Sequence, residues 1–205
     1  TTWSAPKRLT WTAGTSSRPT VAVDSTWVVF VVYGDDTWGK AEVFFKRSFD
    51  AGANWSAPIR MTWNPGGSYF PEMLIDPSDM IHVFWQDDSF GNNEILYKSS
   101  TDKGTTWSGL QRLTWNPGIS QYPIAAVGPG ADLYIVWNDD TVANHEIYFK
   151  KSTDSGATWG VITRLTWMND YSTRPVIAVD SSGIIYVAWN DHMPGNREIY
   201  LKKST

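Results

Sequence analysis

The 205-residue sequence has no cysteine, no long apolar run and no cluster of basic residues. Without cysteine there are no disulfides and no thiolate metal ligands, which is compatible with any cellular compartment. No apolar stretch approaches the roughly 18 residues of a membrane-spanning helix. The net charge of −4 is scattered along the chain, so a nucleic-acid backbone is not an expected partner.

Helical periodicity is absent as well, and an internal repeat takes its place. "RLTW" at 8–11 recurs as "RMTW" at 60–63 and as "RLTW" at 112–115 and 164–167, a constant step of 52 residues. No insertion breaks this period. The same step relates the prolines, glutamates and tryptophans at Pro19, Pro71, Pro123 and Pro175, at Glu42, Glu94, Glu146 and Glu198, and at Trp3, Trp55, Trp107 and Trp159.

Each repeat is predicted to form four β-strands. In the third repeat these are residues 122–127, 133–138, 146–152 and 160–167, short β-branched and aromatic runs bounded by Gly, Pro, Asn and Asp. One such sheet cannot bury both of its faces, whereas a ring of sheets can. The sequence therefore predicts an all-β fold, a β-propeller of four-stranded antiparallel blades with four repeats in the chain.

A turn sequence is written three times, as "SFDAGANW" (48–55), "STDKGTTW" (100–107) and "STDSGATW" (152–159). It falls between the third and fourth predicted strands. There the Asp accepts backbone N–H groups, the Gly supplies a positive φ, and the Trp covers the hairpin. We interpret the turn as a structural joint formed by Ser48, Asp50, Gly52, Trp55, Ser100, Asp102, Gly104, Trp107, Ser152, Asp154, Gly156 and Trp159.

These turns resemble the Asp-box, or BNR repeat, of sialidases and related propellers, some of which are lectins. The resemblance covers essentially the whole chain. It implies a propeller in which the box lies away from the ligand-binding face, and most such relatives have six or more blades. As a guide to fold the motif is strong, and as a guide to function it is weak.

The predicted domain is a single propeller over residues 1–205, with repeats at about 12–63, 64–115, 116–167 and 168–205 plus 1–11. "KKST" at 202–205 and "TTW" at 1–3 match the two halves of one box, so residues 2–11 are predicted to pair with 198–203 and complete the last blade. Three arrangements are open: four blades in one chain, as a monomer; eight blades in a strand-exchanged dimer; or a piece of a longer chain.

Loops between the second and third strands share one face with the links between repeats, and this face is the richer in chemistry. Its candidate ligand-binding residues are Arg18, Arg174, Tyr122, Trp63, Trp115, Asp36, Asp88 and Asp140. Each has a structural alternative. The aspartates can cap their own loops. Trp63 and Trp115 share strand parity with Met61 and Leu113, which points them between blades, although the edge of the face leaves room for stacking on a sugar ring.

The resemblance suggests sialidase activity as a function. Sialidases use three arginines to hold the substrate carboxylate. Here only Arg18 and Arg174 occupy equivalent positions, and Phe70 and Tyr122 stand at the other two. Nearly identical repeats favour a multivalent binder over an asymmetric catalytic site. The leading prediction is a secreted or cell-surface, non-catalytic, glycan-binding propeller. A sialidase-like hydrolase and a protein-binding scaffold are the alternatives.

Neither a cofactor nor a metal site is predicted. The sequence holds three histidines, and His82, His145 and His192 fall in different repeats, too scattered to form a ligand set.

Overall fold

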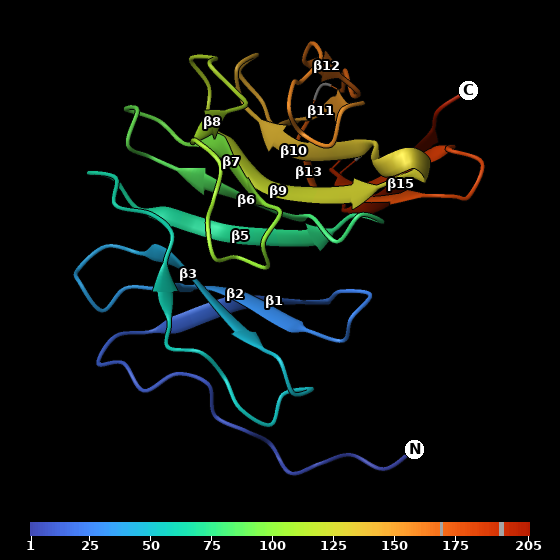
Figure 1. The fold of residues 1–205 in the computed structure, drawn as a ribbon. Coiled ribbons are helices and arrows are strands. Elements are labelled where there is room, and N and C mark those ends of the chain that lie inside the picture. Colours follow the sequence, from blue (N-terminus) through green and yellow to red (C-terminus); the bar gives the residue numbers. More distant parts are fainter. Residues whose placement is uncertain (169, 193–194) are drawn as a thin grey trace.

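A computed structural model describes residues 1–168, 170–192 and 195–205. Asn169 belongs to the link between the third and fourth repeats, and Met193 and Pro194 belong to the loop between the second and third strands of the fourth repeat. These three residues lie outside the described residues. The predicted all-β fold is confirmed (Figure 1). Its only described helical element is the short 3-10 turn η1 (Pro129–Ala131).

The strands form four antiparallel sheets, and in each sheet neighbouring strands follow one another in sequence. The first sheet has β1 (Ser16–Val23), β2 (Val29–Asp35), β3 (Glu42–Ser48) and β4 (Ile59–Arg60). The second has β5 (Ser68–Ile75), β6 (Ile81–Asp87), β7 (Glu94–Ser100) and β8 (Gln111–Arg112). The third has β9 (Ser120–Val127), β10 (Leu133–Asp139), β11 (Glu146–Ser152) and β12 (Thr163–Arg164). The fourth has β13 (Ser172–Val179), β14 (Ile185–Asp191) and β15 (Glu198–Lys203).

The core lies between successive sheets, where alternating residues of the second and third strands point toward the preceding and the following blade. Phe45 of the first blade packs with Trp85 and Leu96 of the second, and similar clusters fill the next two junctions. Trp85, Trp137 and Trp189, near the ends of the second strands, are all buried. The outer strands are shorter than predicted, since β12 keeps only Thr163–Arg164 of the expected 160–167.

The three repeated turns have the same internal hydrogen bonds. In the second, the Gly104 amide donates to Ser100 Oγ (2.9 Å) and the Thr106 amide donates to Asp102 Oδ1 (2.8 Å). The Asp50 and Asp154 carboxylates accept the amides of Asn54 and Thr158 in the same way. The bonds from the backbone and side chain of Asn54 lower the pKa of Asp50 to about 2.

The tryptophans of the second and third turns pack across a blade junction. Trp55 of the first turn instead covers its own hairpin, where Nε1 donates to the Gly52 carbonyl (3.0 Å), and it packs on the first blade. Trp107 meets Phe45 of the first blade edge-on at 5.2 Å between ring centroids. Trp159 meets Tyr97 of the second blade in the same manner at 5.5 Å. The second and third repeated turns therefore join their own blades to the blade before them.

A second cluster, made of Glu, Arg and Thr, recurs where the third and outer strands pair. Arg60 donates to Glu42 (2.6 Å), Arg112 to Glu94 (2.6 Å) and Arg164 to Glu146 (2.7 Å). A threonine hydroxyl donates to the second oxygen of each glutamate, and all three glutamates are buried. Arg112–Glu94 and Arg164–Glu146 are thus cross-strand pairs between the third and outer strands.

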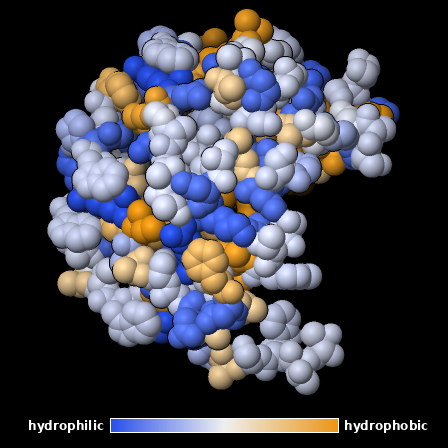
Figure 2. All heavy atoms as spheres, viewed as in Figure 1, coloured by the Kyte–Doolittle hydropathy of each residue, from blue (hydrophilic) through white to orange (hydrophobic). Residues whose placement is uncertain are grey.

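The predicted pairing of residues 2–11 with 198–203 is not formed within the chain. Residues 1–15 form no strand, and among the described residues β15 pairs only with β14. The N-terminal segment instead lies on the first blade, where Lys46 Nζ donates to the Leu9 carbonyl (2.8 Å). The first and last blades are the two ends of an open arc (Figures 1 and 2).

Candidate ligand-binding site at the centre of the arc

The innermost strands β1, β5, β9 and β13 each carry a bulge at an X–Pro pair near their start. The residue before the proline has a positive φ in every blade: 52° at Arg18, 52° at Phe70, 55° at Tyr122 and 54° at Arg174. Regular pairing with the second strand is interrupted at the same points. A positive φ is unfavourable for these residue types, and bulges often re-aim a side chain beside a binding site.

These four residues line one pocket of about 500 Å³ at the face predicted to bind ligand. Its walls are the bulges themselves and the residues that follow them: Arg18, Pro19, Thr20, Phe70, Pro71, Glu72, Tyr122, Pro123, Ile124, Arg174, Pro175 and Val176. Three of the predicted binding residues, Arg18, Tyr122 and Arg174, are thus brought together. They come from the first, third and fourth blades, far apart in the sequence.

An aromatic contact chain runs along one side of this pocket. The Arg18 guanidinium lies over the Phe70 ring, 3.6 Å from its centroid, and the Phe70 and Tyr122 rings meet edge-on at 4.5 Å. The Tyr122 amide donates to Gln86 Oε1 (3.0 Å), which anchors its bulge to the neighbouring blade. The arginine is held against an apolar ring while its donors stay available, because Arg18 is exposed.

Glu72 is the acidic residue of the pocket, and sequence reasoning missed it. Burial raises the pKa of Glu72 to about 7. The signal for finding it was present, because the equivalent positions in the other repeats are Thr20, Ile124 and Val176. With Glu72 protonated, the two arginines give the pocket a net positive charge, which suits an anionic ligand.

The aspartates predicted as ligand contacts lie elsewhere and fasten loops. Asp36 Oδ1 accepts the Thr15 amide (2.6 Å), Asp88 Oδ1 the Gly67 amide (2.7 Å) and Asp140 Oδ1 the Ile119 amide (2.6 Å). Each of these bonds ties the loop after the second strand to the link before the first strand of the same blade. The aspartates therefore have a structural role, as the alternative interpretation predicts, but they cap the neighbouring link and not their own loop.

Trp63 and Trp115 are not part of the central pocket either. Their side chains are 67% and 64% exposed, so they do not pack between blades as their parity predicts. Each indole lies near the arginine of the Glu–Arg–Thr cluster, with Arg60 5.8 Å from Trp63 and Arg112 5.8 Å from Trp115. Trp11 and Trp167 repeat this arrangement with Arg8 and Arg164, which makes a series of exposed aromatic surfaces.

The described residues hold no group of three or more His, Cys, Asp and Glu side chains placed to bind a metal ion. His82 is instead buried, with Nδ1 2.8 Å from the Tyr97 hydroxyl and Nε2 3.4 Å from Asp76. In the same described part of the chain, no helix has the length and apolar character needed to cross a bilayer.

Comparisons with known proteins identify the fold. No protein-family profile and no curated protein sequence matches the chain. Among solved structures, a Hadza microbial sialidase has a TM-score of 0.71 at 16% identity, over 91% of this chain and 44% of its own. The intramolecular trans-sialidase of Ruminococcus gnavus has a TM-score of 0.71 at 13% identity, over 93% of this chain and 68% of its own.

The α-L-arabinanase of Penicillium chrysogenum is similar to the same degree, with a TM-score of 0.69 at 15% identity. The match covers 92% of this chain and 62% of the arabinanase. The chain thus spans about half to two thirds of the length of these proteins. At such low identity the likeness concerns the fold, and the fold is that of the sialidase-like β-propellers.

Proposed function

We propose that the chain is a carbohydrate-binding propeller, secreted or at the cell surface, whose central pocket takes a sugar that carries a carboxylate. The observation that carries the proposal is the convergence of Arg18, Arg174, Phe70 and Tyr122 on one pocket of about 500 Å³. Guanidinium groups bind carboxylates in bidentate geometry, and aromatic rings offer an apolar surface to a sugar. The names of the similar structures, which include sialidases and arabinanases, support a glycan as ligand.

Glu72 gives the proposal a pH dependence. Below its pKa of about 7 the carboxyl group is protonated and leaves the positive charge of the arginines uncompensated. Above that pH it ionises and weakens the attraction for an anion. Affinity for an acidic sugar is therefore expected to fall as the pH rises through 7, and the Glu72→Gln variant is expected to lose this dependence.

Calorimetric titration with sialic acid and with its methyl ester tests the proposal. Binding of the acid and weak binding of the ester are expected. Arg18→Gln and Arg174→Gln should each lower the affinity by about tenfold or more, because a hydrogen bond to a charged group contributes about 1.5–3 kcal/mol. Arg197→Gln, at an exposed arginine outside the pocket, is the matched control. Equal affinity for acid and ester, or no effect of either pocket variant, would contradict the proposal.

Sialidase-like hydrolysis is the second candidate, favoured by one observation: Glu72, with its raised pKa, lines the same pocket as Tyr122. A tyrosine nucleophile with a glutamate partner is one known solution for glycoside hydrolysis. The pocket offers two arginines where a sialidase needs three, so no turnover is expected. Release of product from a fluorogenic sialoside above a heat-killed control, lost in Glu72→Gln, would assign the enzymatic function instead.

A further inference from the structure

Among the described residues, no outer strand pairs with β15 in the last blade. In the first two blades an outer strand pairs with the third strand at Phe44↔Arg60 and Leu96↔Arg112, and Tyr148↔Arg164 repeats this in the third. In the fourth blade β15 pairs only with β14 among the described residues. Ile199 and Leu201 are 73% and 65% exposed, whereas Phe45 and Tyr97, at the position of Leu201, are fully buried. An exposed apolar edge strand is a pairing site for another strand.

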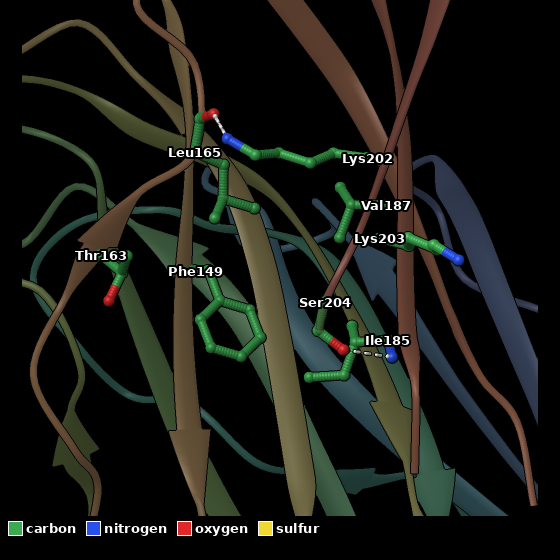
Figure 3. Close-up of a pocket in the computed structure, with 8 residues that line it drawn as sticks. All are labelled: Phe149, Thr163, Leu165, Ile185, Val187, Lys202, Lys203 and Ser204. Atoms are coloured by element: carbon green, nitrogen blue, oxygen red, sulfur yellow. Dashed lines mark hydrogen bonds between the residues drawn. The ribbon is translucent and has the colours of Figure 1, made fainter. Parts of the chain in front are cut away.

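Beside this edge lies an apolar pocket of about 230 Å³, between the third and fourth blades. Figure 3 shows the residues that line it: Phe149, Thr163, Leu165, Ile185, Val187, Lys202, Lys203 and Ser204. One period earlier the corresponding apolar positions are Tyr97, Leu113 and Ile135, and Trp159 packs against that cluster. One period earlier again, Trp107 packs against Phe45, Met61 and Val83. The pocket is therefore shaped for a tryptophan of the repeated turn.

The residues that fit the edge and the pocket lie at the other end of the arc. Lys46 donates to the Leu9 carbonyl, just as Lys98, Lys150 and Lys202 donate to the carbonyls of Met61, Leu113 and Leu165 in the outer strand of the preceding blade. Leu9 thus holds the outer-strand position of a blade that precedes the first one. Six residues upstream, Trp3 is 92% exposed.

Polar groups complete the match. Arg8 Nε donates to the Thr10 carbonyl (2.6 Å), the same bond that Arg60 makes to Thr62 and Arg112 to Thr114. In those blades the arginine and the threonine hydroxyl also hold the buried Glu42 or Glu94. Glu198 is at the equivalent position of β15 and is exposed. Arg8 and Thr10 are its counterparts by the 52-residue step.

We propose that the open edge of the fourth blade binds the N-terminal segment of a second copy of this chain, so that copies associate head to tail. Residues 2–11 of one copy form the outer strand beside β15 of the other, with Arg8 opposite Tyr200 and Lys7 opposite Leu201. Trp3 enters the pocket between the third and fourth blades, and Arg8 pairs with Glu198. The first blade of the incoming copy then covers Ile199 and Leu201. Two copies that repeat this contact close a ring of eight blades, within the range known for propellers.

Disulfide trapping tests the register, because the chain has no cysteine of its own. Directly opposed residues of antiparallel strands lie within reach of a disulfide. A Lys7→Cys, Leu201→Cys double variant is expected to form a reducible covalent species of at least twice 23.1 kDa. The two single variants are the controls and should not form it at the same rate. A disulfide within one chain, or none at all, would overturn the proposal.

Light scattering after gel filtration tests the role of Trp3 without cysteines. The unmodified chain is expected to have the mass of a dimer or a larger assembly, and Trp3→Ala should shift it toward 23.1 kDa. This change should leave the fold of each copy intact, because the side chain is exposed in the single chain. Trp115→Ala, at an exposed tryptophan in the middle of the arc, should leave the mass unchanged. A monomer at every concentration, or an assembly indifferent to Trp3→Ala, would overturn the proposal.

Discussion

The Glu–Arg–Thr clusters and the central pocket are built on the same four repeats, yet they differ in one respect. The clusters have the same residues in every complete blade and the same buried hydrogen bonds. The pocket has Arg18, Phe70, Tyr122 and Arg174 at four equivalent positions, all on the same bulge. Where the repeats agree, the residues hold blades together. Where they differ on an identical backbone, the variation creates an asymmetric site.

The largest loss of stability is expected on replacing a glutamate that recurs in all four repeats. Glu94 is fully buried, bonded to Arg112 and Thr114. Glu94→Ala leaves Arg112 without its carboxylate partner, so the free energy of unfolding should fall by about 3–5 kcal/mol. Urea denaturation measures this loss. Glu72→Ala is the control in the pocket, because burial disfavours the charge of Glu72, and little loss is expected there. Equal losses in the two variants would break the comparison.

The second prediction concerns the pH dependence of stability. Burial raises the pKa of Glu72 to about 7 from its ordinary value of 4.5. Between these two pH values the folded chain holds a proton that the unfolded chain releases, so stability is greatest at the acid end and is lost as the pH rises through 7. Across this range the free energy of unfolding should fall by about 1–3 kcal/mol because of Glu72. Denaturation midpoints of the protein and of Glu72→Gln, measured across this range, should converge at acid pH and separate above it. Parallel curves would show that the pKa of Glu72 is not raised in the folded chain.

Most of the fold could be predicted from the sequence, because a 52-residue repeat with a turn signal about every ten residues admits few arrangements. The bounds of β10 and β11 match the predicted strands to within one residue. The outer strands could not be predicted in length. Their ladders end after two residues at Thr163–Arg164, and the flanking residues bond to the third strand only at single points such as Leu165 N to Ile147 O.

The site was predictable in part, and for a physical reason. Arg18, Arg174 and Tyr122 stand out because they differ between repeats while the following proline does not. Glu72 has the same signature two residues later, but its importance depends on burial at the axis, which no local pattern reveals. The aspartates attract attention as charged loop residues, and only the path of the neighbouring link shows that they bond to Thr15, Gly67 and Ile119.

The smallest effect is expected at the exposed tryptophans, where the parity of the strand predicted packing and the structure shows open rings. Trp115 is 64% exposed. The Arg112 guanidinium lies 5.8 Å and the Lys150 ammonium 5.4 Å from the centroid of its ring. Because such contacts contribute about 0.5–1 kcal/mol at exposed sites, Trp115→Ala should lower the free energy of unfolding by no more than about 1 kcal/mol.

Trp137 of the same blade is fully buried, and Trp137→Ala should cost about 3–5 kcal/mol. Urea denaturation of the two variants measures both losses in the free energy of unfolding, so that they can be compared directly. A loss at Trp115 close to that at Trp137 would mean that the indole packs between blades in solution, and the series of aromatic surfaces would then belong to the core. A small loss would agree with the exposed ring that the structure shows at Trp115.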